Sequence, residues 1–368
     1  MVGTPLNGSL SGATDGFIMR YNAAGSLVGS TYLGTSVYDQ CYFVQLNTSD
    51  EVFVVGQTHG SYPVSPGRYN TVGGSQFIHK LAHTLSTSLW STRFGNGDNQ
   101  QDLSPTALLV SDCGQIYFSG WGGTVNGSAG NPTSTTNGMQ VSADAFQGTT
   151  DGNDLYLMLL EPEAVALNYA TFFGGSLSPE HVDGGTSRFD KNGTVYQAVC
   201  AGCQGNSDFP TTPGAWSNTN NSPNCNLGVF KFDFGTPLVV AAFSAPELLC
   251  AERILTFTNL SGEVVGTPNS YLWDFGDGSS STLPSPTHTY LAPGTYTVRL
   301  TATNPNACNG SDVILHDVVV EPAGPPVTAM NDTLICGPVG SITLSATSNG
   351  TADDFIWSSS SSFLDTLN

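Results

Sequence analysis

The sequence Tyr271-LWDFGD-Gly278 places two aromatic residues, Trp273 and Phe275, directly before an Asp-Gly turn. Asp-Gly favours a tight hairpin, because glycine adopts positive φ without steric cost. We expect the two aromatic side chains to face a core. Asp274 and Asp277 are expected to bind the backbone of the turn rather than to act as catalytic carboxylates.

Short strand-like runs lie on both sides of this segment. The clearest is Gly294-TYTVRLTA-Thr303, in which apolar and polar residues alternate with the period of a half-buried strand. Similar runs begin near Val239, Ile254, Thr287 and Val313. Together they predict an all-β sandwich domain over residues 238–322.

The same region resembles a known family. Its motif is similar to that of PKD domains, and the residues that carry the likeness are Trp273, Asp274, Phe275, Gly276, Asp277 and Gly278, with His288-T-Tyr290 and Gly294-TYT-Val298. The resemblance covers the whole domain and implies an Ig-like fold.

The pattern starts again after a Pro-rich linker near Glu321. Cys336 precedes Trp357 at nearly the spacing by which Cys250 precedes Trp273. This spacing predicts the front half of a further Ig-like domain over residues 327–368, truncated where the sequence ends.

Repeated blocks organise the first two thirds of the chain. The first block of each repeat has a β-rich run, a polar turn and a closing glycine, and it recurs at Asp15–Gly34, Gln76–Gly95 and Asp154–Gly174. A second block follows at Glu51–Gly56, Gln115–Gly120 and Thr194–Val199, and a third ends on the aromatic residues Tyr69, Phe146 and Trp216. A fourth copy begins at Leu227, and the insertion Gly122–Gly138 is expected to be a surface loop.

Units of four short strands separated by turns are typical of β-propeller blades. The repeats resemble the SBBP repeats of secreted bacterial proteins, especially of Bacteroidetes, through Phe209-PTTPGA-Trp216 and the ending Tyr32-L-Gly34. The resemblance implies an incomplete β-propeller over residues 1–235, cut at its N-terminus.

Charge excludes several classes of partner. The chain has 9 Lys+Arg against 29 Asp+Glu, a formal net charge of −20. It should therefore bind neither nucleic acid nor an anionic membrane surface. No apolar run approaches the length of a membrane span. Carboxylates could bind Ca²⁺, but no segment has the spacing of an EF-hand loop, so no cofactor is expected.

Eight cysteines suggest an oxidising compartment. Cys250 and Cys308 flank Trp273 like an Ig-type pair, and we expect a structural disulfide between them. Cys336 should pair beyond residue 368. Cys200-A-G-Cys203 with Cys225 is expected to form disulfides rather than a zinc or redox site, since a second C-x₂-C and a following helix are both missing.

The sequence contains no recognisable catalytic motif. His79 and His83 are expected to be surface histidines rather than a metal pair, and Glu161 and Glu163 to lie in a solvated turn. His181 and Asp183 could line the mouth of the propeller and bind a ligand. Two tripeptides, Asp332-Thr333-Leu334 and Asp365-Thr366-Leu367, resemble the O-glycan acceptors of Bacteroidetes, which makes Thr333 and Thr366 candidate glycosylation sites.

These features predict a non-enzymatic, secreted or cell-surface protein with a structural or adhesive role and protein or glycan partners. The resemblance also implies type IX export and a relation to gliding-associated adhesins. One alternative is an accessory region of a secreted hydrolase. Another is a glycan-binding propeller in which Trp121 or Trp216 stacks on sugars, although such aromatics serve more simply as core anchors. Self-assembly through open sheet edges is conceivable, but no residue argues for it.

Overall fold

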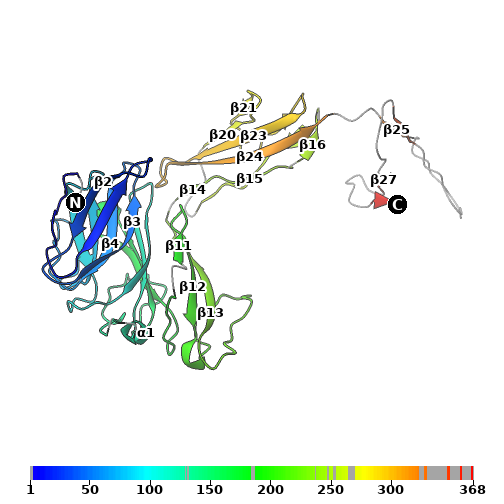
Figure 1. Ribbon diagram of the computed structural model, residues 1–368. Coiled ribbons are helices and arrows are strands. Elements are labelled where there is room, and N and C mark those ends of the chain that lie inside the picture. Colours follow the sequence, from blue (N-terminus) through cyan, green and yellow to red (C-terminus); the bar gives the residue numbers. More distant parts are fainter. Residues whose placement is uncertain are drawn as a thin grey trace. The chain divides into compact units, whose positions relative to one another are not determined.

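The structure is a computed structural model of the chain (Figure 1). It describes residues 3–322 except 129, 131, 184–186, 237, 247, 252–253 and 264–269, and beyond residue 322 only four short strands. The chain divides into an N-terminal unit, residues 1–236, and a C-terminal unit, residues 237–368. The predicted all-β class is confirmed: the described part contains only one five-residue helix and two 3₁₀ turns besides its strands.

The N-terminal unit is built from successive antiparallel sheets. The first sheet pairs β1 (Gly16–Tyr21) with β2 (Leu27–Leu33). The second has the order β3 (Asp39–Leu46), β4 (Val52–Thr58), β5 (Gln76–Leu81), β6 (Ser88–Phe94). The third runs β7 (Ser104–Val110), β8 (Ile116–Trp121), β9 (Leu155–Leu160), β10 (Leu167–Phe173). The fourth has β11 (Ser187–Phe189), β12 (Val195–Ala201) and β13 (Asn226–Phe232).

Each sheet packs on the next through a separate hydrophobic core. Phe53 of β4, Trp90 of β6 and Phe118 of β8 belong to the core between the second and third sheets. Leu157 of β9 and Phe230 of β13 belong to the core between the third and fourth. The strands β3, β7 and β11, each the first of its sheet, lie side by side. The sheets are open, so a closed propeller is not shown.

The sequence repeats are offset from the sheets. The first blocks correspond to β1–β2, β5–β6 and β9–β10, and the second blocks to β4, β8 and β12. A four-stranded sheet therefore takes its first two strands from one repeat and its last two from the following repeat.

The glycine that closes each first block leaves room for a carboxyl group. A Cβ added to Gly34 would lie 2.6 Å from Cγ of Asp15, and one added to Gly95 would lie 2.5 Å from Oδ2 of Asp102. One added to Gly174 would overlap Oδ1 of Asp154. The repeated glycine is thus explained by close approach to a buried carboxyl.

The C-terminal unit contains a β-sandwich. Its larger sheet has the order β16 (Leu248–Cys250), β24 (Ser311–Glu321), β23 (Gly294–Thr303), β20 (Ser270–Asp274), β21 (Ser280–Ser281). Facing it are the pairs β14 (Val239–Val240) with β19 (Gly262–Glu263), β15 (Phe243–Ser244) with β18 (Thr258–Asn259), and β17 (Ile254–Thr256) with β22 (Thr287–Thr289).

The segment Trp273–Gly278 has the expected geometry. Trp273 and Phe275 are buried in the sandwich core, and Nε1 of Trp273 donates to the carbonyl of Leu283 at 2.9 Å. Asp274 accepts the amide of Gly276 at 3.0 Å, and Asp277 accepts that of Ser279 at 2.9 Å. The carboxylates therefore hold the turn, while Gly276 and Gly278 adopt φ of 80° and 90°.

The strand register contradicts the predicted Cys250–Cys308 disulfide. Cys250 ends β16 and lies opposite Glu321, the last residue of β24, whereas Cys308 precedes the first residue of that strand. At about 3.3 Å per residue, a strand of 11 residues separates the two cysteine backbones by roughly 30 Å. A disulfide needs Cα atoms within about 7 Å. The expected pair was based on the order of Cys250, Trp273 and Cys308 along the chain, whereas the sheet places Cys250 at the end of β24 farther from Cys308, which is itself disulfide-bonded.

Beyond residue 322, β25 (Val327–Ala329) pairs with β26 (Ala346–Ser348), and β27 (Trp357–Ser358) pairs with β28 (Thr366–Leu367). Thr333 and Cys336 lie outside the described residues, and the side chain of Thr366 is not among those described. Glycosylation at Thr333 and Thr366 therefore stays a prediction. Among the described residues, helices capable of crossing a membrane are not found.

Candidate functional site

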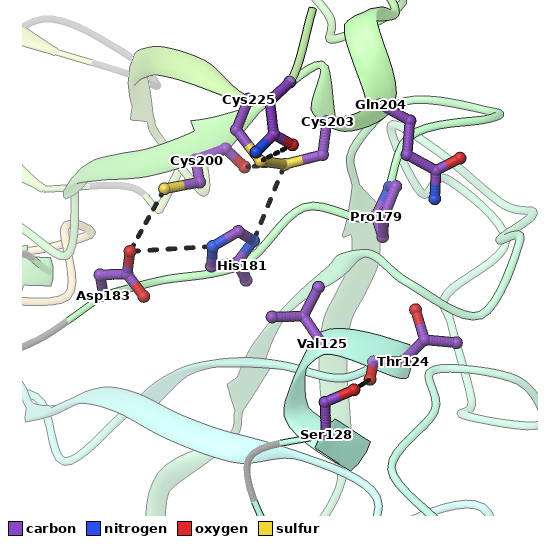
Figure 2. A pocket seen from close by; sticks show the side chains of 11 residues that line it. Thr124, Val125, Ser128, Pro179, His181, Asp183, Cys200, Cys203, Gln204 and Cys225 are labelled. Carbon is purple, nitrogen blue, oxygen red and sulfur yellow. Dashed lines mark hydrogen bonds and ion pairs between the residues drawn. A yellow bond between two sulfur atoms is a disulfide. The ribbon is translucent and has the colours of Figure 1, made fainter.

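A cavity of about 480 Å³ opens in the N-terminal unit among the helix α1 (Thr124–Ser128), the segment before β11, the end of β12 and the 3₁₀ turn η2 (Cys203–Gly205) (Figure 2). Its lining is mostly polar and sulfur-containing: Thr124, Val125, Ser128, Pro179, His181, Asp183, Cys200, Cys203, Gln204, Asn224 and Cys225.

One wall comes from the insertion that was expected to be a surface loop. Asn126 of α1 is buried: its side chain donates to Oγ of Ser134 at 2.8 Å and accepts from Oγ of Ser104 at 2.9 Å. These bonds hold α1 against β7. The loop prediction is therefore wrong for this part of the insertion, because its polar residues bind one another in the interior.

The cysteines of the cavity divide into two kinds. Cys203 and Cys225 form a disulfide, as expected for this cluster. Cys200 keeps a free thiol. A sequence cannot assign three neighbouring cysteines to one disulfide and one thiol, since that choice depends on the loop between β12 and β13.

The free thiol lies beside His181 and Asp183. His181 and Cys200 form an isolated antiparallel bridge, in which the amide of Cys200 donates to the carbonyl of His181 at 2.9 Å and the reverse bond measures 3.3 Å. Sγ of Cys200 donates to Oδ2 of Asp183 at 3.4 Å, and Nε2 of His181 lies 3.7 Å from the same oxygen. Figure 2 shows Asp183 between the thiol and the imidazole.

An arrangement in which Asp183, rather than His181, contacts the sulfur of Cys200 does not activate the thiol. Burial raises the pKa of Cys200, and the hydrogen bond and charge of Asp183 raise it further. A nucleophilic cysteine needs the opposite arrangement, with a histidine next to sulfur and the carboxylate behind it. The three groups are better suited to binding than to thiol catalysis.

Nδ1 of His181 faces the disulfide, 3.8 Å from Sγ of Cys203, and the imidazole ring packs against Trp121 with 6.0 Å between ring centroids. These contacts fix the orientation of the ring, whose side chain is 13% exposed. Asp183 is mostly exposed and lines the cavity.

The other predicted histidine pair is separated. His79 is buried in β5, where its ring bonds the hydroxyls of Tyr62 at 2.8 Å and Ser88 at 2.7 Å. Burial lowers the pKa of His79 to about 4. His83 follows the strand and is exposed. The expectation of two surface histidines is therefore wrong for His79, because both faces of β5 are covered by neighbouring sheets.

The expected solvated turn is a link between sheets. Glu163 lies in η1 (Pro162–Ala164), and its carboxylate binds Nζ of Lys80 at 2.6 Å and Nε1 of Trp90 at 2.6 Å. Lys80 also pairs with Glu51 at 2.7 Å. Glu161, which bonds the side chain of Asn168, matches the prediction of a carboxylate at the surface. The Glu163 side chain is 45% exposed, but its carboxylate is bound to Lys80 and Trp90.

The two tryptophans considered for stacking on sugars differ in their exposure to solvent. Trp121 is buried, which fits the simpler interpretation of a core anchor, whereas Trp216 is fully exposed. At the corresponding positions of earlier repeats, Tyr69 packs into the core between two sheets, and Phe146 stacks on Phe173. The anchor interpretation is therefore wrong for Trp216 in this chain.

Carboxylates alone do not gather into a calcium site in the described part of the chain. Both groups of three close donor atoms found there contain His181. In the C-terminal unit, Asp277 is occupied by His288, whose Nε2 lies 2.8 Å away.

Comparison with known proteins concerns mainly the sandwich. The family model for the PKD domain matches residues 237–319. Collagenase ColA of Bacillus cereus is 40% identical over 68 residues, and a microbial collagenase of Vibrio alginolyticus is 40% identical over 77 residues. These matches cover 14% and 21% of this chain but only 7% and 8% of the relatives.

A solved structure resembles the same part. The PKD1 domain of the Vibrio cholerae metalloprotease PrtV shares 30% identity with a TM-score of 0.20, and the match covers 23% of this chain and 98% of that domain.

Proposed function

Since residues 237–319 form a PKD domain, we propose that the chain is a non-catalytic, extracellular part of a modular secreted or cell-surface protein with a structural or adhesive role. The observation that carries this proposal is that every side chain of the PKD motif has a structural role. Its aromatic residues fill the core and its two aspartates bind backbone amides of the turn. The motif stabilises a spacer and leaves no group of its own for chemistry.

The N-terminal unit is proposed to be part of an SBBP-type β-propeller. Its support is the stacking of antiparallel four-stranded sheets with β3, β7 and β11 side by side, as the inner strands of neighbouring blades would lie. The closing glycines Gly34, Gly95 and Gly174 occupy the same place in each sheet, which supports a common blade design.

An extracellular location is supported by several independent features. PKD domains occur in the secreted relatives, the net charge of −20 favours solubility, and the Cys203–Cys225 disulfide suits an oxidising compartment. Type IX export from a Bacteroidetes cell, a relation to gliding adhesins and surface protein or glycan partners rest on the SBBP resemblance alone.

A second candidate is an accessory region of a secreted hydrolase. The matches to two collagenases and to a domain of a metalloprotease favour it, because in those proteins the matched stretch is a small share of the whole. In this case the chain would position or bind the substrate of a neighbouring catalytic domain.

Surface proteolysis of intact source cells tests the first proposal. An antibody against the chain should detect it on the cell surface or in the medium, and protease added outside should remove the surface signal while a cytoplasmic marker protein survives. Retention of the chain in the cytoplasm would refute the proposal. A peptidase or glycosidase domain in the full-length gene product would favour the accessory role instead.

A further inference from the structure

Three potential metal ligands from the segment before β11 and from the end of β12 meet at the cavity in the N-terminal unit. The donor atoms of His181, Asp183 and Cys200 all lie within 4.8 Å of one another. The backbone bridge between His181 and Cys200 holds two of them in register through two hydrogen bonds. Two of the three ligands are therefore held by paired backbone, and Asp183 follows His181 by two residues.

The separations suit tetrahedral coordination. Zinc bonds of about 2.3 Å to sulfur and about 2.0 Å to nitrogen or oxygen place S and O roughly 3.5 Å apart and N and O roughly 3.3 Å apart. The corresponding distances here are 3.4 Å from Sγ of Cys200 to Oδ2 of Asp183, and 3.7 Å from that oxygen to Nε2 of His181. Small side-chain movements would complete the geometry.

The charge of the site also favours a divalent cation. A thiolate and a carboxylate would be adjacent, and none of the described residues that line the cavity is a lysine or an arginine. In the metal-free site the thiol keeps its proton and donates it to Asp183. A metal ion can replace that proton, forming the sulfur–metal bond as the proton leaves to solvent.

The groups around the three ligands limit which atoms could occupy the fourth coordination position. Cys203 and Cys225 are joined to each other, which removes them as thiolate ligands. Packing against Trp121 keeps the imidazole of His181 in place. On the open side, the cavity of about 480 Å³ has room for a water molecule or a ligand group.

We propose that His181, Asp183 and Cys200 bind a divalent transition-metal ion of the Zn²⁺ type, with the fourth coordination position open to the cavity. Thiolate and imidazole ligands select such ions over Ca²⁺ or Mg²⁺. Three protein ligands with an open position can accept an exogenous group, so this site could anchor a carboxylate or imidazole of a partner.

Titration of the full 368-residue chain with Co²⁺ under non-reducing conditions tests the proposal. One equivalent should bind and give the near-ultraviolet absorption of a thiolate–cobalt bond, and Zn²⁺ should displace it. Because binding releases the thiol proton, the apparent affinity should rise with pH.

Three variants separate this site from other metal-binding groups. Cys200→Ser should abolish the thiolate absorption. Asp183→Asn, which changes a mostly exposed side chain, should weaken binding by at least the roughly 10- to 100-fold typical of changes around metal sites. Cys41→Ser removes the other free thiol among the described residues and should leave binding unchanged.

The proposal is overturned if Co²⁺ binds without a thiolate signature, or if Cys200→Ser binds it as the unchanged chain does. Failure to bind one equivalent, or peptide mapping that finds Cys200 in a disulfide, also overturns it.

Discussion

Buried carboxyl groups at the connections between sheets are the most unusual residues of the N-terminal unit. Asp102 precedes β7 and accepts the amide of Asn96 and the hydroxyl of Ser75, each at 3.0 Å. Glu180 precedes β11 and accepts the amide of Gly175 at 2.9 Å. Burial raises the pKa of Asp102 to about 7, and that of Glu180 to about 7. Both connections are therefore sensitive to pH near neutrality.

The sign of this dependence follows from linkage. A carboxyl whose pKa is raised in the fold favours the protonated native state. The stability that it contributes is complete below the unfolded pKa of 3.8 and is lost as the pH rises through about 7. We expect Asp102 alone to lower the free energy of unfolding by roughly 2–3 kcal/mol between about pH 5 and about pH 8.

Asp102→Asn tests this expectation, since the amide keeps an acceptor for Asn96 and Ser75 but cannot ionise. Urea unfolding followed by tryptophan fluorescence should show a variant less sensitive to pH than the unchanged chain. The control, Asp112→Asn, alters an exposed carboxylate and should keep the original dependence. Parallel pH profiles for the chain and Asp102→Asn would contradict the assignment.

The sequence predicts the role of a single residue where that role depends only on residues nearby in the chain. Trp273 and Asp277 could be assigned from alternation and an Asp-Gly turn. Cys250 could not, because its partner depends on which strand crosses to β24. Nor could the convergence of His181, Asp183 and Cys200, since a backbone bridge between two non-adjacent segments has no signal in the residues themselves.

Salt bridges of Lys80 also join the second sheet to the third. Lys80 of β5 has a side chain only 7% exposed, and it pairs with Glu51 of its own sheet and with Glu163 from the β9–β10 connection of the next. Since Glu163 also binds Trp90, one carboxylate connects two strands of the second sheet to the third. A buried ammonium that loses a partner is costly to keep.

Glu163→Gln should weaken this link. The variant keeps an oxygen for Trp90 but removes the charge facing Lys80, and we expect a loss of about 1–2 kcal/mol in the free energy of unfolding. Thermal and urea unfolding of the N-terminal unit within the full chain measure it. Glu161→Gln, two residues away without a lysine partner, should cost less than half as much. Equal effects of the two substitutions would rule out a specific link.

Strand identity was predictable for these elements, but strand partnership was not. The repeated blocks correctly mark the β-rich runs that became β5, β9 and β12. They do not reveal that β3–β4 of one repeat begin a sheet that β5–β6 of the following repeat complete. The Glu163 contact follows from that packing, so it was hidden for the same reason.

Considered as a whole, the N-terminal unit presents apolar side chains at both ends of its stack of sheets. On β1 these are Phe17, Met19 and Tyr21, and on β13 they are Leu227 and Val229, which are 73% and 70% exposed. The alternate residues of the same strands, such as Phe230, face the cores. An exposed apolar sheet face favours association with another sheet.

The chain should therefore self-associate as its concentration rises, and Val229→Lys should raise the dissociation constant by roughly tenfold, equivalent to about 1.4 kcal/mol. Sedimentation velocity over a concentration series measures this change. Val72→Lys adds the same charge at an exposed valine outside β1 and β13 and should have little effect. A chain that stays monomeric throughout, or a control variant with the same effect, would show that the β13 face is not adhesive.

The offset between repeats and sheets has a consequence for how such a chain can lengthen in evolution. Tandem duplication of one repeat adds the closing pair of strands to one sheet and the opening pair to the next. The copied stretch need not begin or end at a structural boundary, because every junction falls inside a sheet whose remaining strands are supplied by the neighbouring copy. Unequal recombination at any point of the repeat would thus yield an additional whole sheet, with the same pairing register and the same glycine beside a buried carboxyl.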